Sequence, residues 1–383
     1  MANDLARTPS TGIHVQACGD MHLVNLGLFA TPERNLVFDV NDFDETLPGP
    51  WEWDLKRLVA SFVVSARTVG LGDDVGREAA HTAAEAYRLR MRELADLTSL
   101  ERRYLRVDVD VALGDALRTT HLDAKEARQV AKRTSKVIAK ARSKTRFQAL
   151  DRYTALEDGR RVIVPDPPLV QRLEDEKQRK TVRKFFDHYK TTVPDHVHRL
   201  LDDYRFVDVA LKVVGVGSVG TRAFMVLLAN EAGEDPLFLQ IKEAQPSVLS
   251  PHVGASRYDN DGRRVVEGQR LLQAASDLFL GWGSAGGRDY YVRQLRDMKG
   301  GADPSTMLRG GYIAYAALCG TTVAHAHARS IEPDILVGYL GTGANADDAL
   351  TTFAAAYADQ TERDHEALVA AVRAGRIDAI EGV

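Results

Sequence analysis

The sequence has few cysteines and no long apolar run, and both absences limit what the protein can be. Its 383 residues include only two cysteines, Cys18 and Cys319, which are too few for a disulfide framework and fit a reducing compartment. No apolar stretch is long enough to span a bilayer. The opening residues, MANDLARTPSTG, lack the hydrophobic segment of a signal peptide. We therefore expect a soluble, cytoplasmic protein with no membrane partner.

Neither sign of charge dominates the chain, which has a net charge of -4, 27% charged residues and 44% hydrophobic residues. This composition is ordinary for a globular protein, and it gives no general attraction for nucleic acid. Residues 125–146 are locally basic, and a solvated helix face explains them more simply than a site for an anionic partner. Because single cores stop growing at roughly 250–300 residues, the length favours two packed parts.

The apolar patterns predict an α+β fold. Residues 12–40 indicate two short strands around a loop, and prolines in the acidic stretch 41–54 exclude a helix there. Residues 55–144 have helical spacing, and residues 151–200 are interpreted as a connection. From residue 206 onward the pattern indicates a strand, a glycine turn and a strand. The elements expected next are a strand over 235–244, a helix over 263–282, a strand over 288–295 and two helices over about 311–329 and 346–374.

The segment GVGSVG, with glycines at 215, 217 and 220, could approach phosphate oxygens through its backbone N–H groups. A dinucleotide site would need a helix after the last glycine. Instead Phe224, Val226 and Leu228 alternate as in a strand. A nicotinamide site is therefore disfavoured, and an ordinary hairpin turn is the alternative to a phosphate-binding loop.

Lys242 lies in the apolar stretch LFLQIKEA, one predicted strand after the glycines. Kinases have their phosphate-pairing lysine in this relation to the glycine loop. An ammonium in an apolar strand needs a counter-charge, and Glu267 on the next predicted helix could provide it. The alternative is an edge-strand lysine that faces solvent.

A second group of polar residues lies near the amino end, in CGDMHLVNLG. Asp20 and Asn25 are five residues apart with His22 between them, which is the separation of the base and the metal-binding asparagine in the kinase catalytic loop. Asp42 follows in NDFDE, like the aspartate of the D-F-G triplet. One carboxylate could orient or deprotonate an acceptor hydroxyl, while an amide oxygen and a second carboxylate hold Mg²⁺. Asx turns would explain each residue singly, but not their order between strands.

These segments resemble known families. GDMHLVN closely resembles the H-G-D-x-H-x-x-N loop of aminoglycoside and choline kinase-like phosphotransferases, and NDFDETLPGPWEWDLKRL resembles their following segment, with Asp54 at the place of a structural aspartate. In segments such as FDVNDFDETLPGPWEWDLKRL, VVGVGSVGTRAF and VVEGQRLLQAASDLFLGW, the chain is also similar to a bacterial family known as domain of unknown function 2252. Members of that family often carry more chain before the position of Met1.

The resemblance implies roles for individual residues and implies ATP and Mg²⁺ as cofactors. The expected catalytic residues are Asp20 (the base), His22, Lys242 and Glu267. The expected metal ligands are Asn25, Asp42 and Asp44, with Asp39 as a further competitor. The expected nucleotide contacts are Gly215, Gly217, Ser218 and Gly220 over the phosphates, Lys242, and the backbone near Leu295 at adenine. Two departures are Cys18 in place of the histidine before Gly-Asp and Arg222 in place of the strand valine over adenine.

The order of these segments reverses that of kinases, in which the glycine loop and lysine precede the catalytic loop. The helix expected at 311–329 resembles the one that leads into the catalytic loop of the phosphotransferases, yet no Gly-Asp-x-His follows it. The resemblance thus implies a circularly permuted, two-lobed, protein-kinase-like fold. Its expected parts are a catalytic-loop part at 1–200, a sheet part with the glycine loop at 206–300, and returning helices at 301–383.

The function expected from the resemblance is phosphoryl transfer from ATP to a hydroxyl of a small molecule or a protein. Nucleotidyl transfer on the same scaffold is a variant of this hypothesis. The competing class is a catalytically inert kinase-like module that binds nucleotide or a partner. The joint presence of Asp20, Asn25, Asp42 and Lys242 favours the enzyme, although a fold alone does not establish a function.

Overall fold

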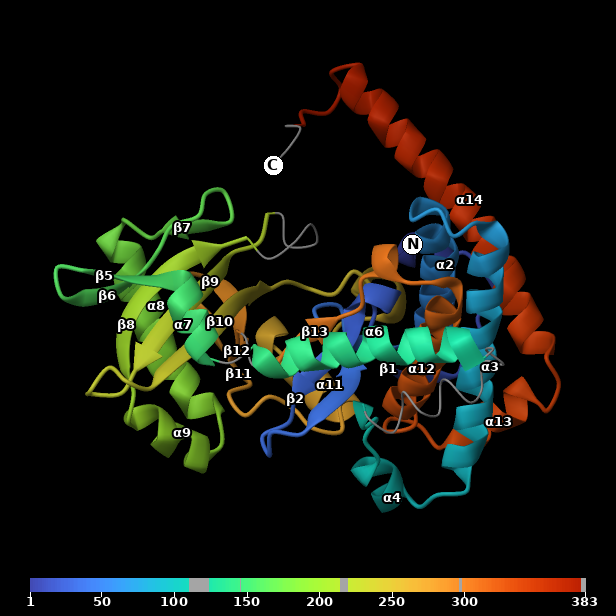
Figure 1. Ribbon diagram of the computed structural model, residues 1–383, viewed down its shortest axis with the longest axis horizontal. Helices are drawn as coiled ribbons and strands as arrows, with labels where there is room; N and C mark the ends of the chain where they lie inside the picture. The colour runs from blue at the N-terminus through green and yellow to red at the C-terminus, as the bar shows by residue number, and fades with distance from the viewer. Residues whose placement is uncertain (110–123, 145, 214–219, 296–297, 380–383) are drawn as a thin grey trace.

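A computed structural model describes residues 1–109, 124–144, 146–213, 220–295 and 298–379. It contains helices and several antiparallel sheets, as the α+β prediction requires. Figure 1 shows a sheet-rich part at one end and a helix-rich part at the other, with α6 (Ala124–Ser143) running between them. No helix within the described ranges is both long and apolar enough to cross a membrane.

The largest sheet has six antiparallel strands in the order β11-β12-β10-β9-β8-β7. Their bounds are β7 Val170–Arg172, β8 Arg205–Lys212, β9 Ala223–Ala229, β10 Pro236–Ala244, β11 Gly281–Ala285 and β12 Arg288–Gln294. The two strands predicted after residue 206 are β8 and β9, which pair antiparallel, whereas the glycine turn predicted between them lies largely outside the described residues. The prediction that one helix covers 263–282 is wrong, because α11 ends at Leu272 and residues 281–285 form β11.

The two central strands, β9 and β10, are buried along their whole length, since helices cover both faces of the sheet. On one face, Phe185 of α8 (Glu176–Tyr189) and Leu201 of α9 (Asp195–Asp202) join a cluster with Leu239. On the other face, Tyr153 of α7 (Arg146–Tyr153) packs with Phe238. Strands buried on both faces are apolar without alternation, as these two are.

Residues 146–202 therefore belong to the sheet part, whereas the sequence analysis placed the stretch up to residue 200 with the catalytic loop. This stretch also contains β5 (Thr154–Glu157), β6 (Arg160–Ile163) and the short helix η2 (Lys190–Thr192). Its helices present apolar residues to the sheet, and β7 pairs directly with β8. The packing thus makes this stretch a cover of the sheet rather than a connection.

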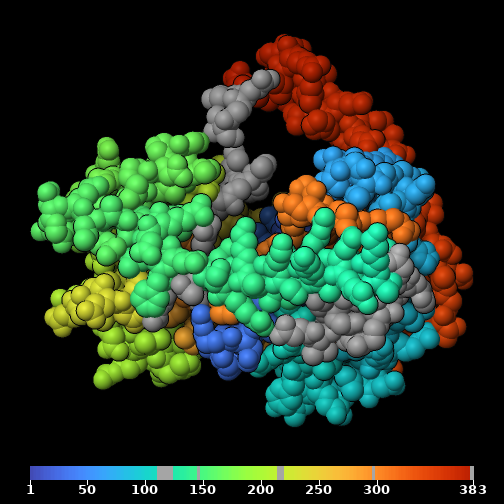
Figure 2. All heavy atoms as spheres, in the orientation of Figure 1, coloured from blue at the N-terminus to red at the C-terminus, as the bar shows by residue number. Residues whose placement is uncertain are grey.

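The helix-rich part is built on α2, α3, α12 and α14. Their bounds are α2 Trp51–Thr68, α3 Asp73–Ala95, α12 Arg309–His327 and α14 Asn345–Arg373. The shorter helices of this part are α1 Ala2–Leu5, α4 Ser99–Tyr104, η4 Pro304–Thr306 and α13 Pro333–Leu340. α12 and α14 are the two helices predicted at the end of the chain, and α13 between them was not predicted, so the prediction of only two helices there is wrong. The space-filling view shows the end of α14 standing away from the body over an open gap (Figure 2).

Short strands connect the helix-rich part to the sheet part. β1 (His14–Ala17) pairs with β4 (Leu47–Pro50), and a small sheet has the order β13-β2-β3. The bounds of that sheet are β2 Leu26–Ala30, β3 Leu36–Val40 and β13 Gly300–Gly301; the short helices nearby are η1 Leu23–Asn25 and α10 Ser250–Val253. The main core contains α11 (Asp261–Leu272) together with the helices of the helix-rich part. α11 therefore joins the two parts of the molecule.

Candidate functional site

The loop between β1 and β2 carries the first predicted residues, Asp20, His22 and Asn25. The Asn25 side-chain Nδ2 donates to the carbonyl oxygen of Asp20 at 2.7 Å. Arg57 on α2 forms an ion pair with the Asp20 carboxylate, and His22 Nε2 lies 3.7 Å from the same carboxylate. Burial lowers the pKa of His22, so its ring is predominantly neutral at pH 7. The Asp20 carboxylate therefore lies between the guanidinium of Arg57 and the neutral imidazole of His22.

A buried chain of polar groups fixes the start of this loop. Asp54 on α2 accepts backbone N–H groups from Cys18 at 2.6 Å and Gly19 at 2.9 Å. His327 Nε2 at the end of α12 lies 3.2 Å from the same carboxylate, and Tyr87 OH lies 2.9 Å from His327 Nδ1. Buried networks of this kind hold one conformation when every member is satisfied. Asp54 thus positions the loop.

The end of α12 also lies beside the strand that enters Cys18. Ser330 Oγ accepts the backbone N–H of Gln16, in β1, at 2.9 Å. Gly19 has a φ of 85°, and a Cβ at this position would lie 2.5 Å from the carbonyl oxygen of Glu45. Glycine is therefore required there.

The segment after β3 brings the predicted acidic residues to Lys242 of β10. The ammonium of Lys242 forms an ion pair with Asp44 and lies 3.8 Å from Asp42 Oδ2. Tyr291, on the neighbouring strand β12, donates its hydroxyl to Asp44 Oδ1 at 2.8 Å. Two carboxylates thus share one buried ammonium that comes from a strand about 200 residues later in the chain.

Two cations set the charge of Asp42. Burial by itself raises the pKa of Asp42, but Lys242 and Arg293, with smaller contributions from the Asp44 N–H and His22, outweigh burial, so the pKa is lowered. Arg293 is fixed by hydrogen bonds to Gln240 Oε1 and to the carbonyl oxygen of Asn41, both at 3.0 Å. Asp42 is therefore a carboxylate at neutral pH. Its backbone oxygen accepts Cys18 Sγ at 3.0 Å, which ties this segment to the first loop.

The ion pair predicted between Lys242 and Glu267 is not formed. Glu267 Oε1 instead lies 3.2 Å from Arg270 on the same helix, and within the described ranges the carboxylates bound to Lys242 are those of Asp42 and Asp44. Helix α11 reaches the site through a different residue. The buried guanidinium of Arg264 donates to the carbonyl oxygens of Thr46 and Asp44 at 2.8 Å and of Gln245 at 2.7 Å.

The predicted nucleotide contacts fall partly outside the described residues. Gly215, Gly217 and Ser218 lie in the range 214–219, which the structure does not describe, and Gly220 has a φ of 87°. The N–H of Leu295 donates to the carbonyl oxygen of Phe238 at 2.9 Å. This N–H is therefore engaged within the protein, and an adenine contact from it is not supported.

Sequence reasoning missed Tyr291, Arg293, Arg264 and Arg57. A signal for the first two was present, because Tyr291 and Arg293 are two residues apart in a strand and so share one face of the sheet. No comparable signal marked Arg57 or Arg264, whose partners are distant in the sequence.

The expected metal ligands are carboxylates and one amide, that of Asn25. Among the described residues, no three His, Cys, Asp or Glu side chains gather as a metal site. The Nδ2 of Asn25 donates a hydrogen bond to Asp20, so the amide oxygen is the atom of this side chain that could bind a metal. With the carboxylate of Asp42 it offers the hard oxygen atoms that Mg²⁺ prefers. Asn25 and Asp42 are therefore the residues that could hold Mg²⁺.

Comparison with known proteins places the chain within a family. A family described as "Uncharacterized protein conserved in bacteria (DUF2252)" matches residues 1–371. No curated protein and no solved structure matches the chain.

Proposed function

The chain belongs to this bacterial family, and from its own site geometry we propose that it is a kinase-like enzyme that transfers a phosphoryl group from ATP·Mg²⁺ to a hydroxyl acceptor. The observation that carries the proposal is the meeting of Lys242 with Asp42 and Asp44. It joins the two groups of residues that the sequence motifs predict for one active site, despite their distance along the chain and their reversed order.

The arrangement of elements supports a permuted, kinase-like fold. The glycine segment connects two antiparallel strands, the lysine lies on the next strand, and α11 precedes two further strands of the same sheet. This is the succession of elements that the resemblance implies for the small lobe. The catalytic-loop segment and α12 lie in the other part, as the permutation requires.

Each residue has a role in the proposed reaction. Asp20 orients the acceptor hydroxyl and accepts its proton. Asn25 and Asp42 would hold Mg²⁺, which would neutralise charge on the phosphates. Lys242 would bind phosphate oxygens. Asp44 and Tyr291 would orient its ammonium, the task that kinases give to a glutamate on the helix.

Magnesium-dependent ATP binding tests the proposal directly. ATP should raise the melting temperature much more with Mg²⁺ than with EDTA, since a ligand at about a hundredfold over its dissociation constant adds roughly 2.7 kcal/mol. Asp42→Asn should remove the magnesium-dependent part. The control is Asp187→Asn, which changes an exposed aspartate of α8 and should leave the response intact.

A second measurement separates an enzyme from a binding module. Asp20→Asn should bind ATP·Mg²⁺ nearly as the wild type does but lower turnover by about 10²–10⁴-fold, the usual contribution of a general base. The assay uses γ-labelled ATP with a panel of metabolites and proteins. A parallel assay with α-labelled ATP detects nucleotidyl transfer, in which the acceptor would carry the α-phosphate label. Binding without ATP consumption by the wild type would leave the inert module as the better explanation, and no ATP binding at all would refute the proposal.

A further inference from the structure

A cavity of about 340 Å³ lies beside the Lys242 cluster and is distinct from it. Asn41 and Arg293 line the cavity, whereas Asp20, Asp42 and Lys242 are not among the described residues that do so. Its walls come from the β2–β3 turn, α11, the stretch before β11, the end of α9 and the residues after β12. This volume is within the range of small-ligand sites.

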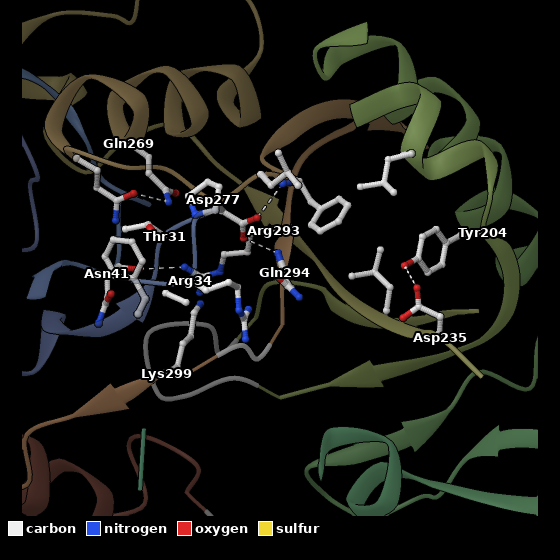
Figure 3. A pocket seen from close by; sticks show the side chains of 18 residues that line it. Thr31, Arg34, Asn41, Tyr204, Asp235, Gln269, Asp277, Arg293, Gln294 and Lys299 are labelled. Atoms are coloured by element: carbon white, nitrogen blue, oxygen red, sulfur yellow. Dashed lines mark hydrogen bonds between the residues drawn. The ribbon is translucent and has the colours of Figure 1, made fainter. Parts of the chain in front are cut away.

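The charged side chains of the cavity differ in how far they are hydrogen-bonded within the protein. Asp277 accepts the N–H groups of Phe279 at 2.8 Å and Gln294 at 2.6 Å. Asp235 accepts the hydroxyl of Tyr204 at 2.6 Å. Figure 3 shows Arg34, Arg293 and Lys299 on one side of the view, with Tyr204 and Asp235 across from them. The carboxylates are therefore engaged by the protein, and three cationic side chains line the same space.

Lys299 differs from the other two cations of the cavity. Throughout the described residues, no hydrogen bond or ion pair involves its ammonium, although its carbonyl oxygen accepts Lys144 Nζ at 2.9 Å. Burial and the neighbouring Arg293 lower the pKa of Lys299 to about 7, against the opposing effects of Asp277 and Asp42. A bound anion would offset both the cost of burying the charged ammonium and its repulsion by Arg293.

We propose that this cavity binds a small organic anion, a carboxylate or a phosphate ester, whose charged group lies between Lys299 and Arg293. The amide of Gln269, which also lines the cavity and donates to Gln273 at 3.0 Å, offers a hydrogen-bond acceptor to neutral polar atoms of the ligand. The proposal does not depend on phosphoryl transfer. It assigns a second ligand to the molecule, next to the residue Asn41 that precedes Asp42.

Titration calorimetry of the full chain, without ATP or Mg²⁺, tests the site with malonate, sulfate and glycerol 3-phosphate as probes. Lys299→Met keeps the apolar stem and loses the charge, so it should weaken binding by about ten- to a hundredfold. Lys299→Arg should restore most of it. The control is Lys136→Met on the exposed face of α6, which should bind as the wild type does.

The pH dependence of sulfate binding is a second readout, because sulfate keeps its charge across neutral pH. Binding should weaken from about pH 6 to about pH 8.5 in the wild type, since a protonated Lys299 is needed, and should be flat in Lys299→Arg. The other charged groups near the ammonium are Arg34, Arg293, Lys144, Asp42 and Asp277.

The outcomes separate this proposal from the proposed activity. Asp20→Asn should bind the three probes as the wild type does, whatever its effect on turnover. Equal binding by Lys299→Met and the wild type, with melting temperatures that show both are folded, would overturn the site. So would the absence of saturable binding for all three probes at millimolar concentration.

Discussion

At the scale of single residues, the centre of the site is one ammonium shared by two carboxylates. The Lys242 side chain is 8% exposed, whereas Asp42 and Asp44 are 34% and 28% exposed. Removing a cation from such a pair leaves carboxylates partly buried without compensation. The loss is largest when both acids are ionised, and it should therefore depend on pH.

We expect Lys242→Met to destabilise the protein at pH 7 by about 2 kcal/mol, less than the roughly 3–5 kcal/mol typical of fully buried pairs, because the carboxylates keep contact with water. In the wild type the lowered pKa of Asp42 contributes stability that is present above its unfolded pKa and is lost as pH falls through the folded value. The variant lacks this contribution. The difference between the two proteins should therefore shrink at acidic pH, below the ordinary aspartate pKa of about 4.

Urea denaturation of both proteins at several pH values measures this difference. Lys184→Met changes an exposed lysine of α8 and should leave stability within about 0.5 kcal/mol of the wild type. A difference for Lys242→Met that stays constant with pH would contradict the ion pair.

The site residues differ in how far the sequence could predict them. Asp20, Asn25, Asp42 and Lys242 carry spacings that follow from a chemical task, and the structure brings Asp42 to Lys242. The partner of the lysine was mistaken, because Glu267 fits the helical position expected for it but faces Arg270. Which carboxylate reaches an ammonium depends on how α11 packs, and spacing does not contain that information.

At the scale of elements, glycines decide how closely α12 and α3 approach. A Cβ at Gly320 would lie 2.0 Å from the backbone oxygen of Ala83. Gly320→Ala should therefore force the helices apart and destabilise the protein by about 1–3 kcal/mol or more. Gly338, in α13, has nothing within 4 Å of its Cβ position, so Gly338→Ala should stabilise by up to about 1 kcal/mol.

Thermal and urea unfolding of the two variants supply the comparison. The two substitutions are chemically identical, and both are in helices, so opposite signs would isolate the packing from the helix propensity. If Gly320→Ala were as stable as Gly338→Ala, the close contact between α12 and α3 would be disproved.

Elements were predictable where local signals were strong. The strand over 288–295 and the helices over 311–329 and 346–374 match β12, α12 and α14 to within a few residues. The strands β2 and β4 were missed, because Leu26–Ala30 and Leu47–Pro50 are short and contain glycine or proline. β2 is held by pairing with β3, and β4 by pairing with β1. A local sequence pattern does not reveal such pairing.

At the scale of the whole molecule, two cores share strands. Tyr290 and Val292 of β12 enter the cluster between the sheet and its α8–α9 cover, while Tyr291 between them enters the core of the helix-rich part. In β10 the cluster of the sheet includes Ile241, and the helical core includes Ala244. Alternate side chains of one strand point to opposite faces. Neither core can therefore be lost alone without removing residues from the other.

Because the two cores share residues of β10 and β12, we expect the sheet part and the helix-rich part to unfold together. The three tryptophans lie in different elements, Trp51 and Trp53 in α2 and Trp282 in the sheet strand β11, although the Trp282 ring packs against the core of the helix-rich part. A Trp282→Phe protein follows α2 by fluorescence, and a protein with Trp51 and Trp53 both replaced by phenylalanine follows strand β11 and its contact with the helix-rich core. In each protein the fluorescence midpoint in urea should coincide with that of far-ultraviolet circular dichroism, which detects all helices and strands.

Substitution of a buried tryptophan can lower the midpoint itself, so the comparison is made between the two probes within each protein. Two separated transitions in either protein would show that the parts are independent, and the contacts of Tyr291 would then not couple them.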